Sequence, residues 1–215
     1  MDQGDYNSPF QEAQLTKILL YSFLEKSSNC AFASELRALK NQLVSEQDDD
    51  GELQTDGNRF GQPEAIIYPN LEEEEIFRII GAQLAEIGDQ LAAEIDPSFV
   101  QNLVRQFMAE NMSKEAITNH LSQVVKEVVR RIPLEMEQER AMLVVAMVLA
   151  KKVANTVPSL LQQVFSTTVN YINQNLRDYV NNLEQVNEGN TTCLPLRNLF
   201  FKKTTTPGNS YKELF

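Results

Sequence analysis

The chain has 215 residues, of which 19 are Lys or Arg and 30 are Asp or Glu, so its formal net charge is −11. Phosphate backbones repel a chain this acidic, and we therefore expect no nucleic acid among its partners. Hydrophobic residues make up 42% of the sequence, while Gly and Pro number only eight each. Apolar and polar residues rarely alternate with the period of a strand, so the expected fold class is all-α.

The N-terminal residues and the cysteines favour a cytoplasmic protein. Residues 1–13 are polar and are expected to form a flexible N-terminus. They lack the basic segment with which a secretory signal begins. Cys30 and Cys193 lie far apart with no CxxC spacing, so we expect both thiols to stay free in a reducing compartment.

Apolar residues at helical spacing predict two helices, around residues 15–23 and 32–43, and a long loop after them. The periodicity stops at residues 44–70, which are rich in acids and hold three Gly and two Pro. A loop of this length inside a compact domain usually either carries a function or is disordered.

This loop contains a candidate protease site. Asp56 is followed by Gly57 and preceded by three further recognition residues, Leu53, Gln54 and Thr55. A caspase cuts an extended segment after an aspartate and needs a small residue next. The alternative is a plain turn that is never cut, since Asp-Gly is a common turn pair. Residues 1–56 hold four basic and eleven acidic residues, a formal charge of −7, so their loss would remove most of the negative charge.

The next helix, expected over residues 72–95, carries the most informative pattern. Steps of four, four, three and four put its main apolar residues on one face: Ile76, Ile80, Leu84, Ile87 and Leu91. Gly88 and Asp89 lie at the edge of that face. A helical glycine costs about 1 kcal/mol relative to alanine, so Gly88 indicates that a partner approaches closely there. Asp89 is placed to meet a cation. The pattern is typical of a helix that docks into a hydrophobic groove, and the alternative is an ordinary core helix.

The second half of the chain predicts further helices with clear caps. Asp96-Pro97 suits a helix start, Ser113 can cap the next helix, and Pro133 closes it. Residues 141–150 are ten consecutive apolar residues, too few to cross a bilayer, which needs about 20. A run that is apolar all round is normally a buried central helix. A short helix at 159–165 and a last long helix at 169–183 follow.

Three stretches carry a family resemblance. The face at 76–91, with Gly81 as the small residue after an anchor, resembles the BH3 motif of the Bcl-2 family of apoptosis regulators. ELQTDGNR at 52–59 is similar to an initiator-caspase site in that family. MLVVAMVLAKKVANTVPSLLQQVFSTTVNYINQNLRDYV is similar to the central part of the same family member. The resemblance covers roughly residues 10–187.

The resemblance implies a fold and a mode of action. The expected fold is a Bcl-2-like bundle of about eight helices over residues 14–187, around a hydrophobic central hairpin in the region 114–165. The protein would stay latent in the cytoplasm until an initiator caspase cuts after Asp56. It would then move to the mitochondrial outer membrane and activate Bax and Bak, which release cytochrome c. Its BH3 helix would also bind anti-apoptotic Bcl-2 proteins, with Asp89 paired to an arginine of the groove.

Two further features are expected to contribute after cleavage. Gly57 would become a new N-terminus and a lipidation candidate, although Gly61 stands where the acceptor pattern expects Ser or Thr. Cations near the hairpin are candidates for contact with anionic lipids: Lys126, Arg130, Arg131, Lys151 and Lys152. The alternative for each of these is ordinary solubilising charge.

No catalytic signature accompanies these motifs. The single histidine, His120, has no neighbouring metal ligand or nucleophile, so we expect neither an enzyme nor a cofactor or metal site. Residues 188–215 depart from the family pattern and are expected to be a disordered tail. Two competing hypotheses remain: a passive helical adaptor, and a lipid-binding or pore-forming protein that acts without Bax or Bak.

Overall fold

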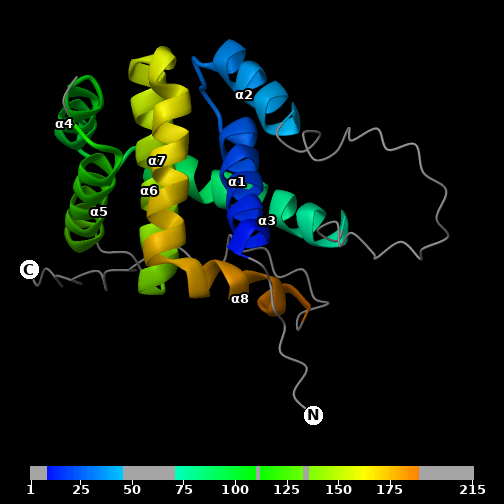
Figure 1. Cartoon of the computed structure of the whole chain (residues 1–215). Coiled ribbons are helices and arrows are strands. Elements are labelled where there is room, and N and C mark those ends of the chain that lie inside the picture. The colour runs from blue at the N-terminus through cyan, green and yellow to red at the C-terminus, as the bar shows by residue number, and fades with distance from the viewer. Residues whose placement is uncertain (1–8, 46–70, 110–111, 133–135, 189–215) are drawn as a thin grey trace, which may run out of the picture.

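The computed structural model describes residues 9–45, 71–109, 112–132 and 136–188. Across these ranges the chain forms eight α-helices and one 3-10 turn, and they contain no strand (Figure 1). The predicted all-α bundle of about eight helices is thereby confirmed. The cleavage candidates Leu53 to Gly57, residues 46–70 as a whole and the tail from 189 onward lie outside the described residues.

The helices follow one another with short connections, except between the second and the third. Their bounds are α1 Pro9–Lys26, α2 Ala33–Ser45, α3 Leu71–Leu91, α4 Pro97–Phe107, α5 Lys114–Arg131, α6 Gln138–Thr156, η1 Pro158–Leu160, α7 Leu161–Asn175 and α8 Arg177–Glu188.

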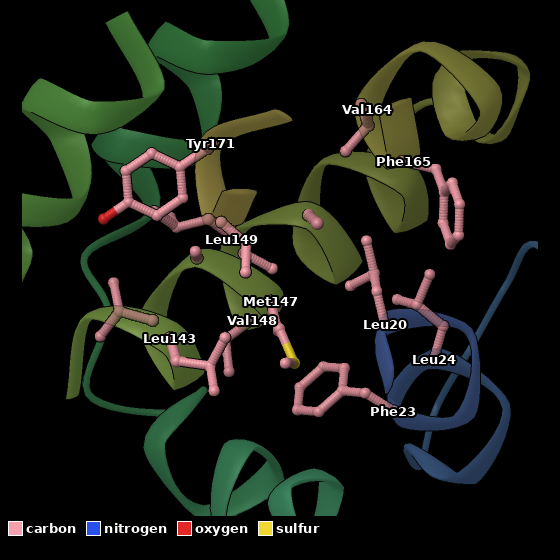
Figure 2. Close-up of a cluster of buried hydrophobic side chains, with 14 of the residues drawn as sticks. Leu20, Phe23, Leu24, Leu143, Met147, Val148, Leu149, Val164, Phe165 and Tyr171 are labelled. Carbon is pink, nitrogen blue, oxygen red and sulfur yellow. The ribbon is translucent and has the colours of Figure 1, made fainter. Parts of the chain in front are cut away.

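Helix α6 forms the centre of the bundle because it has no polar side over most of its length. Every residue from Leu143 to Lys151 is buried. In Figure 1, α6 and α7 stand side by side in the middle, with α4 and α5 on one flank and α1 and α3 on the other. Figure 2 shows the resulting core, where Phe23 of α1 lies beside Met147 and Val148 of α6.

The predicted hydrophobic hairpin region, residues 114–165, spans α5, α6, η1 and the beginning of α7. Within it α6 is buried over most of its length, whereas α7 keeps an exposed polar side that includes Gln162, Gln163 and Ser166. Helix α5 buries only one stripe and presents its other face to solvent, with Lys126 and Arg130 exposed. The sequence marks α5 as apolar at helical spacing, but one stripe is sufficient for an outer helix.

Three helix ends also differ from the sequence prediction. Helix α1 begins at Pro9 rather than near residue 14, and proline suits a first helical position because its missing N–H is not needed there. Helix α3 ends at Leu91 instead of residue 95. Helix α7 is continuous from Leu161 to Asn175, where the sequence suggests a break, and the chain bends at Leu176 instead.

The bend at Leu176 lets α8 run across the end of the bundle, against α1 and α3 (Figure 1). Leu176 and Val180 are buried, and the Tyr179 hydroxyl accepts a hydrogen bond of 3.0 Å from Nε of Arg140 on α6. The helical periodicity continues through the bend, so tertiary contacts decide where α7 ends.

The predicted caps between α3 and α6 are confirmed. The Asp96 carboxylate accepts the N–H of Ser98 at 2.8 Å, and the Ser113 hydroxyl accepts the N–H of Ala116 at 3.1 Å. Helix α5 stops at Arg131 because Ile132 precedes a proline and has extended backbone angles of φ −94° and ψ 120°.

Candidate functional site

The apolar face of α3 is packed inside the bundle, mainly against α1 and α6. Of the five predicted face residues, Ile80, Leu84 and Leu91 are buried, with 8%, 4% and 6% of their surface exposed. Ile76 and Ile87 are partly buried at the edge of the same core. The structure therefore brings the predicted residues onto one face, and in this state that face is covered.

Phe77 is a core residue of α3 that the sequence analysis missed. It is 1% exposed, whereas Ile76 beside it is only partly buried. Phe77, Ile80, Leu84 and Leu91 also follow helical steps, so the signal was present in the periodicity. The opposite face of α3 meets solvent: the side chain of Arg78 is 59% exposed and forms a 3.7 Å ion pair with Glu74.

The two glycines of α3 allow α1 to approach closely. A Cβ atom at Gly81 would lie 2.7 Å from the carbonyl oxygen of Leu19 and 2.8 Å from Cβ of Ser22. A Cβ atom at Gly88 would lie 2.7 Å from Cζ of the Phe23 ring. The close approach predicted at Gly88 is present, and the group that approaches is a side chain of the same molecule.

Asp89 has a cation partner within the chain. Its Oδ1 atom accepts a hydrogen bond of 2.5 Å from Nζ of Lys151 on α6. Its Oδ2 atom accepts the backbone N–H of Ser28 at 2.8 Å, in the turn between α1 and α2. Burial alone would raise the pKa of Asp89, but the hydrogen bonds from Lys151 and Ser28 outweigh it, and the pKa is lowered. The carboxylate is therefore held in its charged form.

Lys151 is buried in this fold, unlike the candidate cations of α5. The sequence marks it as a candidate for lipid contact, but its side chain is only 6% exposed and is paired with Asp89, so in this fold it does not face a membrane. Lys152 is partly buried, and burial lowers its pKa, with Lys151 adding a smaller effect. The other three candidates, Lys126, Arg130 and Arg131, are exposed on α5.

Two of the exposed cations of α5 lie beside a hollow in the surface. Arg130 and Arg131 both pair with Glu127, while Lys126 and Arg130 line a cavity of about 490 Å³ between α5 and α6. Val129 and Met142 contribute apolar surface to it. Glu127, Gln123 and Gln138 complete the lining, so the hollow combines two cations and one acid with a small apolar surface.

The described residues contain no grouping of three or more His, Cys, Asp or Glu side chains that would hold a metal ion. His120 is half-buried on α5, and its Nε2 atom is covered with no hydrogen-bond partner. Cys30 is a free thiol. Among these same residues, no helix combines the length and the hydropathy that crossing a bilayer requires.

Comparison with known proteins identifies the family. The family model of the BH3 interacting domain (BID) matches residues 3–186. The chicken (Gallus gallus) BH3-interacting domain death agonist is 49% identical over 189 residues, covering 84% of this chain and 97% of that protein. The mouse (Mus musculus) protein with the same name is 43% identical over 176 residues, covering 79% of this chain and 89% of that protein. These matches show that the chain belongs to the BID family.

Proposed function

We propose that this protein is a latent pro-apoptotic signal carrier whose α3 helix, once freed from the bundle, binds the hydrophobic grooves of Bcl-2 family proteins. Membership of the BID family supports a non-enzymatic role in apoptosis. The partners are Bax and Bak, which α3 activates to release cytochrome c, and anti-apoptotic Bcl-2 proteins, which bind the same helix.

One observation supports this proposal: the apolar face of α3 is covered by the bundle, with three of its five predicted residues buried and two partly buried. The anchors Ile80, Leu84 and Leu91 contact the core instead of solvent, and Asp89 is paired within the molecule. A groove partner needs those same groups, so the intact bundle and the groove compete for α3. Burying each anchor side chain contributes about 1.5–3 kcal/mol. In the intact protein this free energy stabilises the bundle, and it becomes available to a groove complex only when α3 is released.

Cleavage after Asp56 is the proposed trigger. The cut would separate α1 and α2 from α3 in the covalent chain, and α1 is the helix that presses on Gly81 and Gly88. After the cut, only noncovalent contacts hold the α1–α2 fragment to the rest of the protein. The fragment can then dissociate, which the intact chain prevents. Gly57 would then be the new N-terminus and a candidate lipidation site.

The mitochondrial outer membrane is the proposed destination of the cut protein, which is cytoplasmic before the cut. Lys126, Arg130 and Arg131 would meet its anionic lipids, each contributing about 1 kcal/mol near the surface. Removal of residues 1–56 would also take away a formal charge of −7, which strengthens the attraction of the remainder to an anionic surface.

The test is cytochrome c release from isolated mitochondria. Intact protein, caspase-treated protein, and caspase-treated Asp56→Ala and Gly88→Glu variants are compared. We expect release only from the cut, unaltered protein, because Glu at 88 blocks close approach to a groove. Mitochondria that lack Bax and Bak are the matched control and should release nothing.

Two outcomes would replace the proposal. Release by the cut Gly88→Glu variant, or from mitochondria without Bax and Bak, would favour a protein that acts directly on lipid. Absence of release from every form would favour a passive helical adaptor.

A further inference from the structure

The turn between α1 and α2 is joined by polar contacts to both α3 and α6. The N–H of Ser28 bonds to Asp89 of α3, which also receives Lys151 of α6. Asn155, one turn beyond Lys151 on α6, accepts the N–H of Ala31 at 2.8 Å and donates Nδ2–H to the carbonyl of Asn29 at 3.0 Å. We call this set the polar clasp: Ser28, Asn29, Ala31, Asp89, Lys151 and Asn155.

The backbone of the turn depends on these contacts. Asn29 has φ 55°, and it is the non-glycine residue with positive φ in the described ranges. Asparagine tolerates this left-handed conformation better than most residues but does not prefer it. The bond from Asn155 to the Asn29 carbonyl holds the turn in that conformation. Loss of Asn155 would therefore weaken the turn and leave the N–H of Ala31 without this acceptor, while Ser28 would keep its bond to Asp89.

The polar clasp contains one ion pair, between Lys151 and Asp89. The Lys151 side chain is 6% exposed and the Asp89 side chain 24%, so neither is fully hydrated in the bundle. If α3 leaves with Asp89, the ion pair is broken and Lys151 loses its counter-ion. The pair therefore helps to hold α3 against the central helix.

We propose that the polar clasp sets how readily the α1–α2 segment leaves α3, with Lys151 serving inside the molecule as the cation that a partner groove would otherwise supply to Asp89. The inference rests on the proposed function and assigns a regulatory role to Asn155 and Lys151. Asn155 is a positioning residue here, because it acts on α3 only through the turn that it holds.

Hydrogen exchange resolved by segment, on the intact full-length chain, tests the clasp. We expect Asn155→Ala to speed exchange of the amides at 27–31 and in the last turn of α3 by roughly tenfold, as loss of two hydrogen bonds implies. Amides inside α5 and α7 should keep their rates. Gln162→Ala is the matched control, because Gln162 of α7 donates to Gln42 of α2 at 2.9 Å and so links the same segment outside the clasp.

Two results would overturn the inference. One is an Asn155→Ala chain whose turn and α3 exchange no faster than in Gln162→Ala. The other is equal acceleration in every helix, which would mean that Asn155 supports only global stability.

Binding to an anti-apoptotic Bcl-2 protein supplies the second readout. Uncut Lys151→Met should bind at least several-fold more tightly than the uncut parent, while the isolated 71–91 peptide, which lacks Lys151, serves as the reference for free α3. Unchanged binding by Lys151→Met, with a peptide that does bind, would refute the role of Lys151. A peptide that binds no groove would instead refute the proposed function. The hydrogen-exchange rates would still show whether the polar clasp holds the turn and α3 in place.

Discussion

Phe23 of α1 occupies the space that a side chain at Gly88 of α3 would need. The Phe23 ring is fully buried, and its Cζ atom would lie 2.7 Å from a Cβ atom at position 88, with Cγ2 of Val148 at 3.0 Å. The small residue of the BH3 face is therefore already used inside the bundle. A change at this contact should therefore affect the intact bundle as well as the proposed groove complex.

Gly81→Ala should destabilise the intact protein more than Gly88→Ala. At position 81 the nearest atom is a backbone oxygen of Leu19, which moves only with α1, whereas at position 88 it is the tip of a ring. We expect a loss of about 3 kcal/mol for Gly81→Ala and about 1–2 kcal/mol for Gly88→Ala, measured by urea unfolding. The exposed residue Gln83 provides the control, since Gln83→Ala should change stability by less than about 0.5 kcal/mol. A more stable Gly88→Ala chain would show that helix propensity outweighs crowding there.

Phe23→Ala should activate the uncut chain for groove binding. The substitution leaves a cavity beside Gly88 and costs about 3–5 kcal/mol, which loosens α1 from α3. Binding of the intact variant to an anti-apoptotic Bcl-2 protein, followed by fluorescence anisotropy, should tighten at least tenfold. Phe107→Ala on α4 is the matched control, because Phe107 is equally a core residue but belongs to a helix on the other flank. Equal tightening in both variants would attribute the effect to global instability.

Asp89 and Lys151 should show strong coupling in a double-mutant cycle. Asp89→Asn leaves Lys151 buried without its counter-ion and should cost about 2–3 kcal/mol of unfolding free energy. Lys151→Met should cost less than about 1 kcal/mol, because Asp89 is partly exposed and keeps the N–H of Ser28. The free energy of unfolding of the double variant should be close to that of Lys151→Met. Additive losses measured by urea unfolding would mean that the two side chains do not stabilise each other.

The stability contributed by the Asp89–Lys151 pair should be lost in acid. Because the pKa of Asp89 is lower in the folded state than in the unfolded chain, its contribution is present above the unfolded pKa and disappears as pH falls through the folded pKa. The stability difference between the parent and Asp89→Asn should therefore shrink from about pH 5 downward. The pKa of Asp96 is also lowered, by the N–H of Ser98, so the stability contributed by Asp96 is lost in acid as well. Introducing Asp96→Asn into both the parent and the Asp89→Asn variant removes this second effect from the comparison. A difference that stays constant with pH would contradict the pairing.

Local patterns in the sequence predicted much of this molecule. Steps of three and four placed Ile80, Leu84 and Leu91 on one face of α3, and the cap residues Asp96 and Ser113 marked where α4 and α5 begin. The apolar run of α6 predicted a central helix for the same reason: a helix without a polar side must be buried. These features depend on residues close together in the chain.

The sequence alone did not predict which groups the candidate site contacts. Lys151 lies 62 residues from Asp89, and its position beside another lysine suggested a surface cation, yet the packing of α6 against α3 buries it. Phe77 was missed because Ile76 fits the same periodicity, and only the position of α1 decides which of them is covered.

By itself, the sequence determined that the chain is helical, that α3 has one apolar face with two glycines and an acid, and that α6 has a run that is apolar all round. Each of these is set by spacing within one helix. Only the tertiary structure decided that α1 covers that face, that Lys151 and Ser28 hold Asp89, and that the chain bends at Leu176. Those outcomes depend on contacts between helices far apart in the chain, whose geometry no local periodicity specifies.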